Sequence, residues 1–290
     1  MKKLGVILCS FLMVAAFSWP AFAVPEGGFF VFGTAAGDSS LAANDDSYTS
    51  EISLSTPFTF FGEEKNSLWV NNNGNITFDN PMGAYTPFAF PGLREIVAPY
   101  FADVETSGTG SGSVFYGERT APSDLATINS VVNNAFSGSF SGSFGFLATW
   151  DKVGYYSSHT DLLNTFQLAL ATDGLDSFAV FNYLDDGMSW ETGDASGGSG
   201  GFGGTEAVAG FDAGDDTNYY MISGSGEPGI ANILEDGTNC GVAGQWVFQI
   251  NEGFSPPPNG AEPVPEPATM LLLGSGLIGL AAFRRKFKKR

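Results

Sequence analysis

The chain has 290 residues, 31 of them acidic and 12 basic, and a formal net charge of −19. Residues 24–267 hold all 31 acidic residues but only four basic ones, Lys65, Arg94, Arg119 and Lys152, so the formal charge of this part is −27. Nucleic acids and anionic lipids are therefore excluded as its ligands, because their phosphates are bound by Lys and Arg. Such a charge favours a self-repelling, soluble surface or one that attracts cations.

The first 23 residues form a predicted secretory signal peptide. Two lysines precede a mostly apolar run, and Ala21 and Ala23 form an A-x-A cleavage site. A first transmembrane helix is the alternative, and the cleavage site argues against it. Removal of residues 1–23 leaves Cys240 as the sole cysteine, so no disulfide within the mature chain is expected. Its thiol is then either buried and inert or paired between two chains.

Between residues 24 and 251, short apolar runs alternate with turns rich in glycine, asparagine and serine, which is typical of antiparallel β-structure. Asn73 and Gly74 separate two of these runs and predict a tight hairpin, since both residue types tolerate positive φ. Pro99 predicts that its run is an edge strand or a strand end, because proline cannot donate a ladder hydrogen bond. The predicted strands cover residues 50–61, 68–70, 76–78, 96–102, 114–116, 144–150, 153–156, 164–171, 178–183 and 246–250.

One stretch has helical rather than strand periodicity. Pro122, Ser123 and Asp124 form a helix-start signal, with Ser123 as the predicted N-cap. The apolar residues that follow recur at helical spacing: Leu125, Ile128, Val131, Val132, Ala135 and Phe136. The sequence therefore predicts a mainly β fold, an antiparallel β-sandwich-like domain with one amphipathic helix over about residues 123–136.

Several motifs follow one another along this body in a fixed order. They include Phe-Phe-Gly at 60–62, Leu-Trp-Val-Asn-Asn-Asn-Gly-Asn-Ile-Thr-Phe at 68–78, Ile-Val-Ala-Pro-Tyr-Phe-Ala-Asp-Val at 96–104, Trp-Glu-Thr-Gly at 190–193 and Ala-Gly-Phe-Asp at 209–212. This ordered set resembles the nidogen-like (NIDO) domain. The resemblance implies an extracellular domain over residues 24–251 and a role in cell–matrix adhesion, and it assigns no catalytic residues.

The end of the chain begins with a proline-rich linker over residues 252–263. It leads into a stiff, extended segment, because each proline fixes φ and biases the residue before it away from helix. This segment consists of Val264, Pro265, Glu266 and Pro267.

An uncharged run, residues 268–283, comes next and ends in the basic residues Arg284, Arg285 and Lys286. A run of this kind stops in a membrane with its basic end in the cytoplasm. As a helix it spans roughly 24 Å, against roughly 30 Å of hydrocarbon, which suits a temporary anchor. The sequence therefore predicts a single transmembrane segment at 268–283.

Together these parts, residues 264–290, resemble the PEP-CTERM sorting signal of Gram-negative bacteria. The resemblance implies that an exosortase in the inner membrane recognises the motif and removes the tail. The inner membrane would then hold the chain only transiently, before it reaches the cell surface or the medium. An ordinary single-span anchor behind a proline-rich stalk is the alternative.

Catalytic signals are sparse. Ser199 fits the hydrolase elbow G-x-S-x-G, and residues 198–203 fit G-x-G-x-x-G, but both lie in one glycine-rich stretch without the strand and helix that these motifs require. His159 is the only histidine and would have to serve a Ser-His-Asp site, for which Asp161 is too near in sequence to be an obvious partner. A polar turn over residues 157–161 is the favoured interpretation, and we expect no enzyme.

Acidic clusters are the candidates for metal binding, because Ca²⁺ takes six to eight oxygens from carboxylates and carbonyls, often on loops. Asp212, Asp215 and Asp216 are the calcium candidates, and a solvated acidic loop is the alternative for every cluster. No other cofactor is expected. The clusters are Asn44–Asp45–Asp46, Asp103 with Glu105, Asp185–Asp186, and Asp212 with Asp215–Asp216.

Three functions remain open at this point. The first is an exported, exosortase-processed surface or secreted protein that acts in cell–matrix adhesion or in the organisation of an extracellular or biofilm matrix. The second is a secreted hydrolase, and the third is a calcium-dependent structural matrix protein. Expected partners are the exosortase during export and then the extracellular matrix, a polysaccharide or a surface protein.

Overall fold

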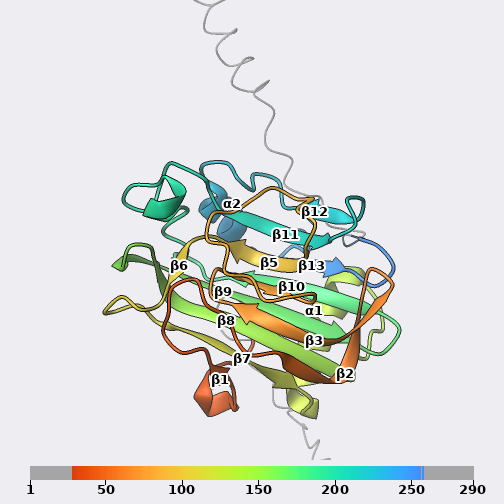
Figure 1. Cartoon of the computed structure of the whole chain (residues 1–290). Coiled ribbons are helices and arrows are strands. Elements are labelled where there is room, and N and C mark those ends of the chain that lie inside the picture. The colour runs from red at the N-terminus through yellow and green to blue at the C-terminus, as the bar shows by residue number, and fades with distance from the viewer. Residues whose placement is uncertain (1–27, 256, 258–290) are drawn as a thin grey trace, which may run out of the picture.

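Two antiparallel sheets stacked face to face form the body of the protein in its computed structural model (Figure 1). The structure describes residues 28–255 and 257. Within this part, no helix has the length and apolar character needed to cross a membrane. Outside it lie the predicted signal peptide with Ala21 and Ala23, most of the linker 252–263, and the predicted sorting signal 264–290 with its segment Val264–Pro267, its apolar run 268–283 and its basic residues Arg284, Arg285 and Lys286.

The first sheet has the strand order β1-β7-β8-β9-β10-β13, and β6 also pairs with β8. The second sheet has the order β12-β11-β5-β4-β3-β2. All of these strand pairs are antiparallel, so the predicted antiparallel sandwich is confirmed. The strands are β1 (Ser39–Ser40), β2 (Ile52–Phe60), β3 (Glu63–Asn71), β4 (Asn75–Thr77), β5 (Glu95–Phe101), β6 (Val104–Glu105), β7 (Ser113–Arg119), β8 (Phe144–Tyr155), β9 (His159–Thr172), β10 (Ser177–Tyr183), β11 (Val208–Ala213), β12 (Tyr219–Met221) and β13 (Gln245–Gln249).

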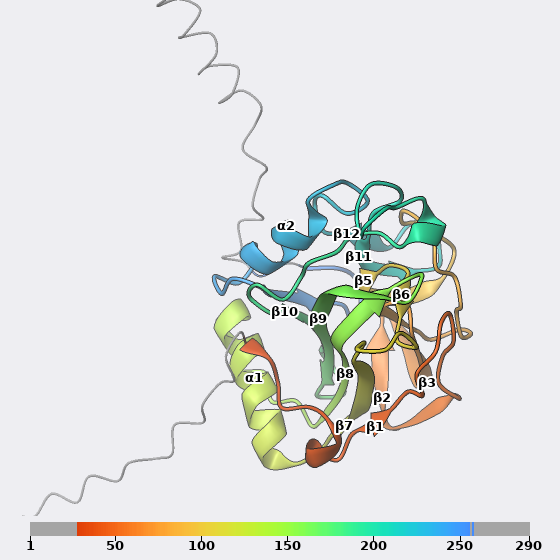
Figure 2. The same cartoon turned by 90° about the vertical axis from the view of Figure 1, so that its left-hand side faces the viewer.

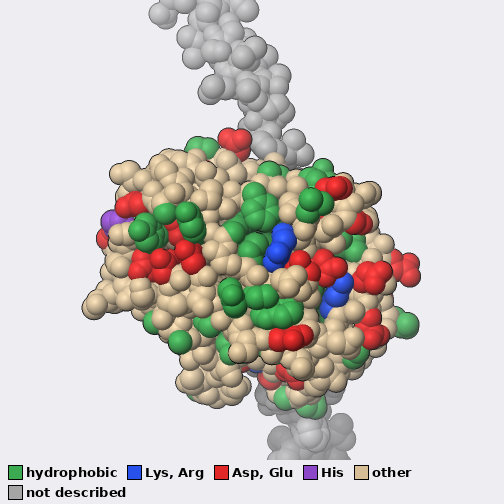
Figure 3. Space-filling model, in the orientation of Figure 1, with side chains coloured by type: hydrophobic (Ala, Val, Ile, Leu, Met, Phe, Trp, Pro, Cys, Tyr) green, Lys and Arg blue, Asp and Glu red, His purple; other side chains and the backbone are tan. Residues whose placement is uncertain are grey.

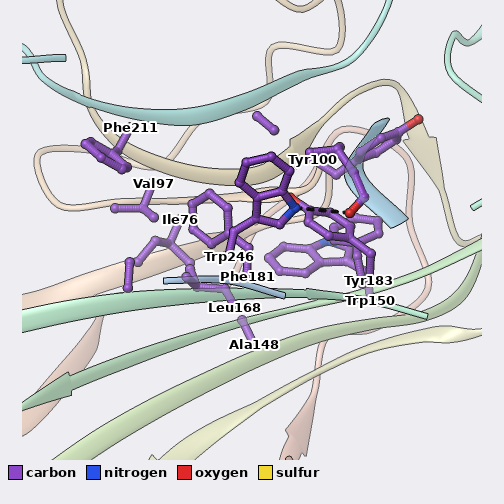
Figure 4. Packing of buried hydrophobic residues seen from close by; sticks show 14 of the residues in the cluster. Ile76, Val97, Tyr100, Ala148, Trp150, Leu168, Phe181, Tyr183, Phe211 and Trp246 are labelled. Carbon is purple, nitrogen blue, oxygen red and sulfur yellow. Dashed lines mark hydrogen bonds between the residues drawn. The ribbon is translucent and has the colours of Figure 1, made fainter. Parts of the chain in front are cut away.

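The main hydrophobic core fills the space between the sheets (Figure 4). Alternation along β8 sorts its side chains, because successive residues of a strand point to opposite faces. Phe146, Ala148 and Trp150 belong to this core, whereas Leu147 belongs to the cluster on the opposite face of the sheet. The Trp150 ring stacks on Phe166 with ring centroids 5.0 Å apart. A tightly packed core that includes aromatic rings therefore holds the two sheets together.

Helix α1 (Pro122–Phe136) covers the outer face of the first sheet (Figure 2). Ile128 and Val132 of this helix pack in one cluster with Leu147 of β8 and Val180 of β10. The predicted amphipathic helix is therefore confirmed. Its apolar face needs no second helix as a partner, because the sheet itself buries it.

The predicted N-cap of this helix is wrong. Ala121 is the N-cap, and Ser123 lies inside the first turn without a capping hydrogen bond. Pro122 accounts for the shift, because its fixed φ and missing N–H suit the first position of a helix. Helix α2 (Ile230–Asp236) was not predicted, and it is too short for apolar periodicity to identify. The structure also has the 3₁₀ helices η2 (Thr34–Ala36) and η3 (Asp194–Ser196).

Two strand predictions need correction. The runs 144–150 and 153–156 form a single strand, β8, whose register shifts between Trp150 and Val153. Pro99 is not on an edge strand, because β5 lies between β11 and β4, but it lies close to a strand end, two residues before the last residue of β5. The register of β11 against β5 shifts beside this proline, which lets the ladder tolerate its missing N–H.

The predicted hairpin is confirmed, with a loop of three residues between Asn71 and Asn75. Only Gly74 of this loop has positive φ, at 77°. A Cβ atom at Gly74 would lie 1.7 Å from the carbonyl oxygen of Tyr100, so only glycine fits. The hairpin is therefore pressed against β5, near one end of the sandwich.

Candidate functional site

Three carboxylates meet at one end of the sandwich. Asp45 and Asp46 belong to the N-terminal segment, and Asp103 lies in the turn between β5 and β6. One oxygen of each carboxylate lies within 4.8 Å of the other two. We call these three residues the acidic corner. Figure 3 shows acidic side chains gathered on this face near β6, with the single histidine, in purple, close by.

The three side chains of the acidic corner differ in how deeply they are buried. Asp45 is exposed, Asp46 is half-buried, and Asp103 is only 1% exposed. The Oδ2 atom of Asp103 is buried and accepts no hydrogen bond from the part of the chain that the structure describes. No Lys or Arg among residues 28–255 forms an ion pair with the three carboxylates. A buried carboxylate without a donor or a counter-charge raises the free energy of the folded state.

The pKa values reflect this crowding. Burial raises the pKa of Asp103 to about 7, and repulsion from Asp46 and Asp45 adds to the effect. Burial, together with repulsion from Asp46, raises the pKa of Asp45 to about 6. An acid whose pKa is higher in the folded than in the unfolded chain destabilises the fold when it is charged. This cost is absent at low pH and grows as the pH rises from about 4 to 7.

Two buried asparagines of the hairpin between β3 and β4 support the acidic corner through hydrogen bonds. The Nδ2 of Asn73 donates to Asp46 Oδ1 at 2.7 Å, and the Oδ1 of Asn73 accepts the N–H of Val104 at 2.9 Å. Asn72 donates from its side chain to the carbonyl oxygen of Val104 and from its N–H to the carbonyl oxygen of Ser47. Both asparagines are at most 1% exposed. The hairpin therefore fixes both halves of the acidic corner relative to each other.

A glycine makes room for the buried carboxylate. A Cβ atom at Gly193 would lie 2.5 Å from both Cβ and Oδ2 of Asp103. The residue that follows, Asp194, donates its N–H to the carbonyl oxygen of Tyr156 at 2.9 Å. The Asp103 side chain is thus enclosed by the loop before η3, which explains its burial.

Two further carboxylates flank the acidic corner, but each has partners within the chain. Glu105 accepts hydrogen bonds from Ser107 and Ser158. Burial raises the pKa of Glu105, but these hydrogen bonds outweigh burial and leave that pKa below its ordinary value. Asp194 Oδ2 lies 3.0 Å from His159 Nε2. These two acids are therefore satisfied without a metal ion.

The predicted calcium residues lie elsewhere: Asp212 is in β11, and Asp215 and Asp216 are in the turn that follows it. Asp212 is buried and accepts the N–H groups of Gly92 and Gly214 at 2.5 and 2.8 Å. Asp215 accepts hydrogen bonds from the two residues at the end of its own turn, Thr217 and Asn218. In the described part of the chain, Asp212, Asp215 and Asp216 do not converge as the acidic corner does. Calcium binding by this loop remains an untested prediction.

His159 begins β9, so the polar turn predicted over residues 157–161 ends at Ser158, three residues earlier than expected. Its Nε2 faces Asp194, and its Nδ1 lies 3.6 Å from Asp161. The ring stacks on Tyr155, with ring centroids 4.6 Å apart. None of the described serine hydroxyls donates to His159, so the described residues do not place a serine nucleophile beside it.

Ser199 is not presented as a hydrolase nucleophile. It lies in an irregular loop after η3, where its N–H donates to the carbonyl oxygen of Phe202 at 2.9 Å. A nucleophile elbow needs a strand before the serine and a helix after it. Neither element flanks residues 197–201 in the structure.

Cys240 is a free, half-buried thiol rather than a fully buried one. Its Sγ lies 3.3 Å from the carbonyl oxygen of Gln245. The residue lines a mainly apolar groove of about 290 Å³ between α1 and the loop before β13. No charged side chain is among the described residues that line it.

Family models match most of the chain. The nidogen-like domain matches residues 66–252, and the PEP-CTERM protein-sorting motif matches residues 263–286. The chain therefore belongs to the nidogen-like domain family, and it carries a C-terminal sorting motif that indicates export. Both resemblances seen in the sequence are thereby confirmed.

Several animal proteins are similar to this chain. Alpha-tectorin of Gallus gallus is 42% identical over 214 residues, which cover 71% of this chain and 10% of that protein. Alpha-tectorin of Homo sapiens is 38% identical over 74% of this chain and 10% of its own length. Nidogen of Drosophila melanogaster is 35% identical over 80% of this chain and 17% of its own length. The chain thus spans only a tenth to a sixth of these relatives. No solved structure matches it.

The sequence identified the three residues of the acidic corner, but it did not predict that they lie close together in the fold. Asn44–Asp46 and Asp103 with Glu105 appeared as two separate clusters. The feature that links the two clusters is the asparagine-rich run at 71–75, whose pattern predicts only a turn. Asn72 donates to the carbonyl oxygen of Val104, and Asn73 donates to the Asp46 side chain and accepts the N–H of Val104, so the two asparagines tie distant loops together.

Proposed function

We propose that this chain is an exported, exosortase-processed protein that acts at the surface or in the extracellular or biofilm matrix of a Gram-negative cell. Its proposed role is adhesion or matrix organisation, without catalysis. The observation that carries the proposal is the succession of a nidogen-like domain over residues 66–252 and a sorting motif over residues 263–286. The family resemblance supplies the adhesion class, and loops on a rigid sandwich are natural contact surfaces.

The charge of the exported part narrows the class of partner. With a formal charge of −27 over residues 24–267, it repels acidic polymers unless cations intervene. We therefore expect contacts with basic proteins, with neutral sugars, or with acidic polymers through divalent cations.

Deletion of residues 24–251, with signal and tail kept, tests the function. The deletion strain should aggregate less or hold its matrix less firmly than the parent, while growth is unchanged. A strain that restores the intact gene is the control. Unchanged aggregation together with a lost hydrolytic activity would favour the secreted hydrolase instead, and His159→Ala would then test the residue that such an enzyme needs.

Processing of the tail is tested separately. An extended, proline-held segment offers its backbone to a protease, so replacement of Pro265 and Glu266 by Ala should leave the protein in the inner membrane. Fractionation and intact mass of the native and altered proteins measure this. Normal maturation of the altered protein would contradict processing through the sorting motif.

A further inference from the structure

We propose that the acidic corner is a calcium site that fastens the N-terminal segment to the end of the sandwich. The proposal names Asp45, Asp46 and Asp103 as the ligands supplied by side chains. It does not depend on the proposed adhesive function, because it rests only on the geometry of this corner.

The ligand set and its spacing favour calcium among the common cations. All three side chains offer only oxygen, and neither His nor Cys is in the group. Calcium–oxygen distances of about 2.3–2.6 Å allow opposite ligands to be about 4.6–5.2 Å apart. The three oxygens lie within 4.8 Å of one another, a spacing compatible with a shared calcium ion. Magnesium demands a near-ideal octahedron at about 2.1 Å and dehydrates reluctantly, so it usually keeps several waters and is bound through only one or two carboxylates.

The buried oxygen of Asp103 distinguishes this corner from a solvated acidic loop. Asp103 is 1% exposed, yet its Oδ2 has no hydrogen-bond partner in the described chain. In β11 and the turn after it, by contrast, Asp212 and Asp215 accept hydrogen bonds from backbone N–H groups. A carboxylate that is withdrawn from water, has an oxygen without a donor and lies within 4.8 Å of two other carboxylates needs a cation to be stable when charged.

The surrounding structure is arranged in advance of binding. Asn73 holds Asp46 through one side-chain hydrogen bond and Val104 through another. Second-shell hydrogen bonds of this kind orient metal ligands. Asp45 lies on the exposed side of the corner, so water can complete the coordination shell there.

Binding should therefore restrain the N-terminal segment. Asp45 and Asp46 precede β2, whereas Asp103 follows β5, so one ion would cross-link two parts of the chain that are far apart in sequence. Sites in extracellular modules bind calcium with Kd of about 0.1–1 mM. We expect this range, because the corner has three carboxylates but an open, solvated side.

The test uses the full chain in a neutral detergent, titrated with calcium chloride at a fixed ionic strength of KCl. Calorimetry should show one calcium ion per chain, with affinity reduced at least tenfold by Asp103→Asn and with weaker binding of magnesium. Asp185→Asn is the matched control, since it removes one exposed carboxylate outside the corner and should leave the affinity unchanged.

A second measurement reports the proposed clamp. At a hundredfold excess of calcium over Kd, the melting temperature should rise by about 5–10 °C relative to EDTA. Calcium should also slow proteolytic cleavage within residues 37–50. Both effects should be lost in Asp103→Asn and kept in Asp185→Asn. No stoichiometric binding, or an equal loss of binding in both variants, would overturn the site and leave only general screening by cations.

Discussion

The segment before β2 is attached to the sandwich through acidic residues at two places. The two places differ in the source of the positive charge that balances these residues. At the first, Asp38 is paired with Arg119 of β7, with contacts of 2.6 and 2.9 Å between the carboxylate and the guanidinium. Both side chains are at most 4% exposed. At the second, Asp45 and Asp46 face Asp103, and no described Lys or Arg pairs with them.

This difference shows how one chain can satisfy buried acids in two ways. Arg119 is part of the covalent chain, so the pair with Asp38 is complete whatever the solution contains. The acidic corner has a surplus of negative charge, so its stability depends on protons or on cations from the solution. Divalent ions should therefore affect the second attachment and leave the first unchanged.

Arg119→Met should have the largest effect. It leaves Asp38 buried without a counter-charge, and breaking a buried pair in this way costs about 3–5 kcal/mol of unfolding free energy. Denaturation with urea should give a similar loss in EDTA and in calcium, because the ion is expected only at the other point. A loss below about 1 kcal/mol, or full rescue by calcium, would show that Asp38 is not held as the contacts indicate.

Asn73→Ala should come next. It removes the hydrogen bond to Asp46 and leaves the buried N–H of Val104 without its side-chain acceptor, at a cost of about 2–3 kcal/mol. Asn218→Ala is the matched control in the other acidic loop, since Asn218 is exposed and should cost at most about 0.5 kcal/mol. Equal losses in the two variants would mean that the buried asparagine does not support the acidic corner.

Two glycines allow the attachments to be perturbed alike. A Cβ atom at Gly117 would lie 2.6 Å from Asp38 Oδ1, and one at Gly193 would lie 2.5 Å from Asp103 Oδ2. Replacement by Ala should cost about 1–3 kcal/mol at either site, because the neighbouring carboxylate must shift. Only Gly193→Ala should also weaken the thermal response to calcium. If Gly117→Ala weakens it equally, the response is not confined to the acidic corner.

The fold was largely predictable, because local pattern determines it. Apolar alternation identified the long strands, and helical spacing identified α1. Short elements such as α2 and β12 were not predicted, because so few residues show no hydrophobic periodicity. Pro99 gave a wrong edge prediction, because the register shift that accommodates it arises only when β5 pairs with β11.

The candidate site was predictable only in part. Composition identified Asp45, Asp46 and Asp103 as members of acidic clusters, and it ranked the loop with Asp212 above them. Composition does not reveal hydrogen-bond partners, and partners distinguish these loops. Asp212 receives two backbone N–H groups, whereas Asp103 Oδ2 receives none. That distinction depends on contacts between segments far apart in sequence, which a single sequence without an alignment does not contain.

The smallest effect separates the two attachments most clearly, because its sign should reverse between them. In EDTA at neutral pH, Asp103→Asn removes a repelling carboxylate from the acidic corner and introduces an N–H donor beside Asp45 and Asp46. It should therefore stabilise the fold slightly, within about 1 kcal/mol. Asp38→Asn, the same substitution at the other attachment, removes the partner of the buried Arg119 and should destabilise. Urea denaturation in EDTA measures both. Clear destabilisation by Asp103→Asn would mean that this carboxylate is already satisfied within the chain, and the case for an external cation would fail.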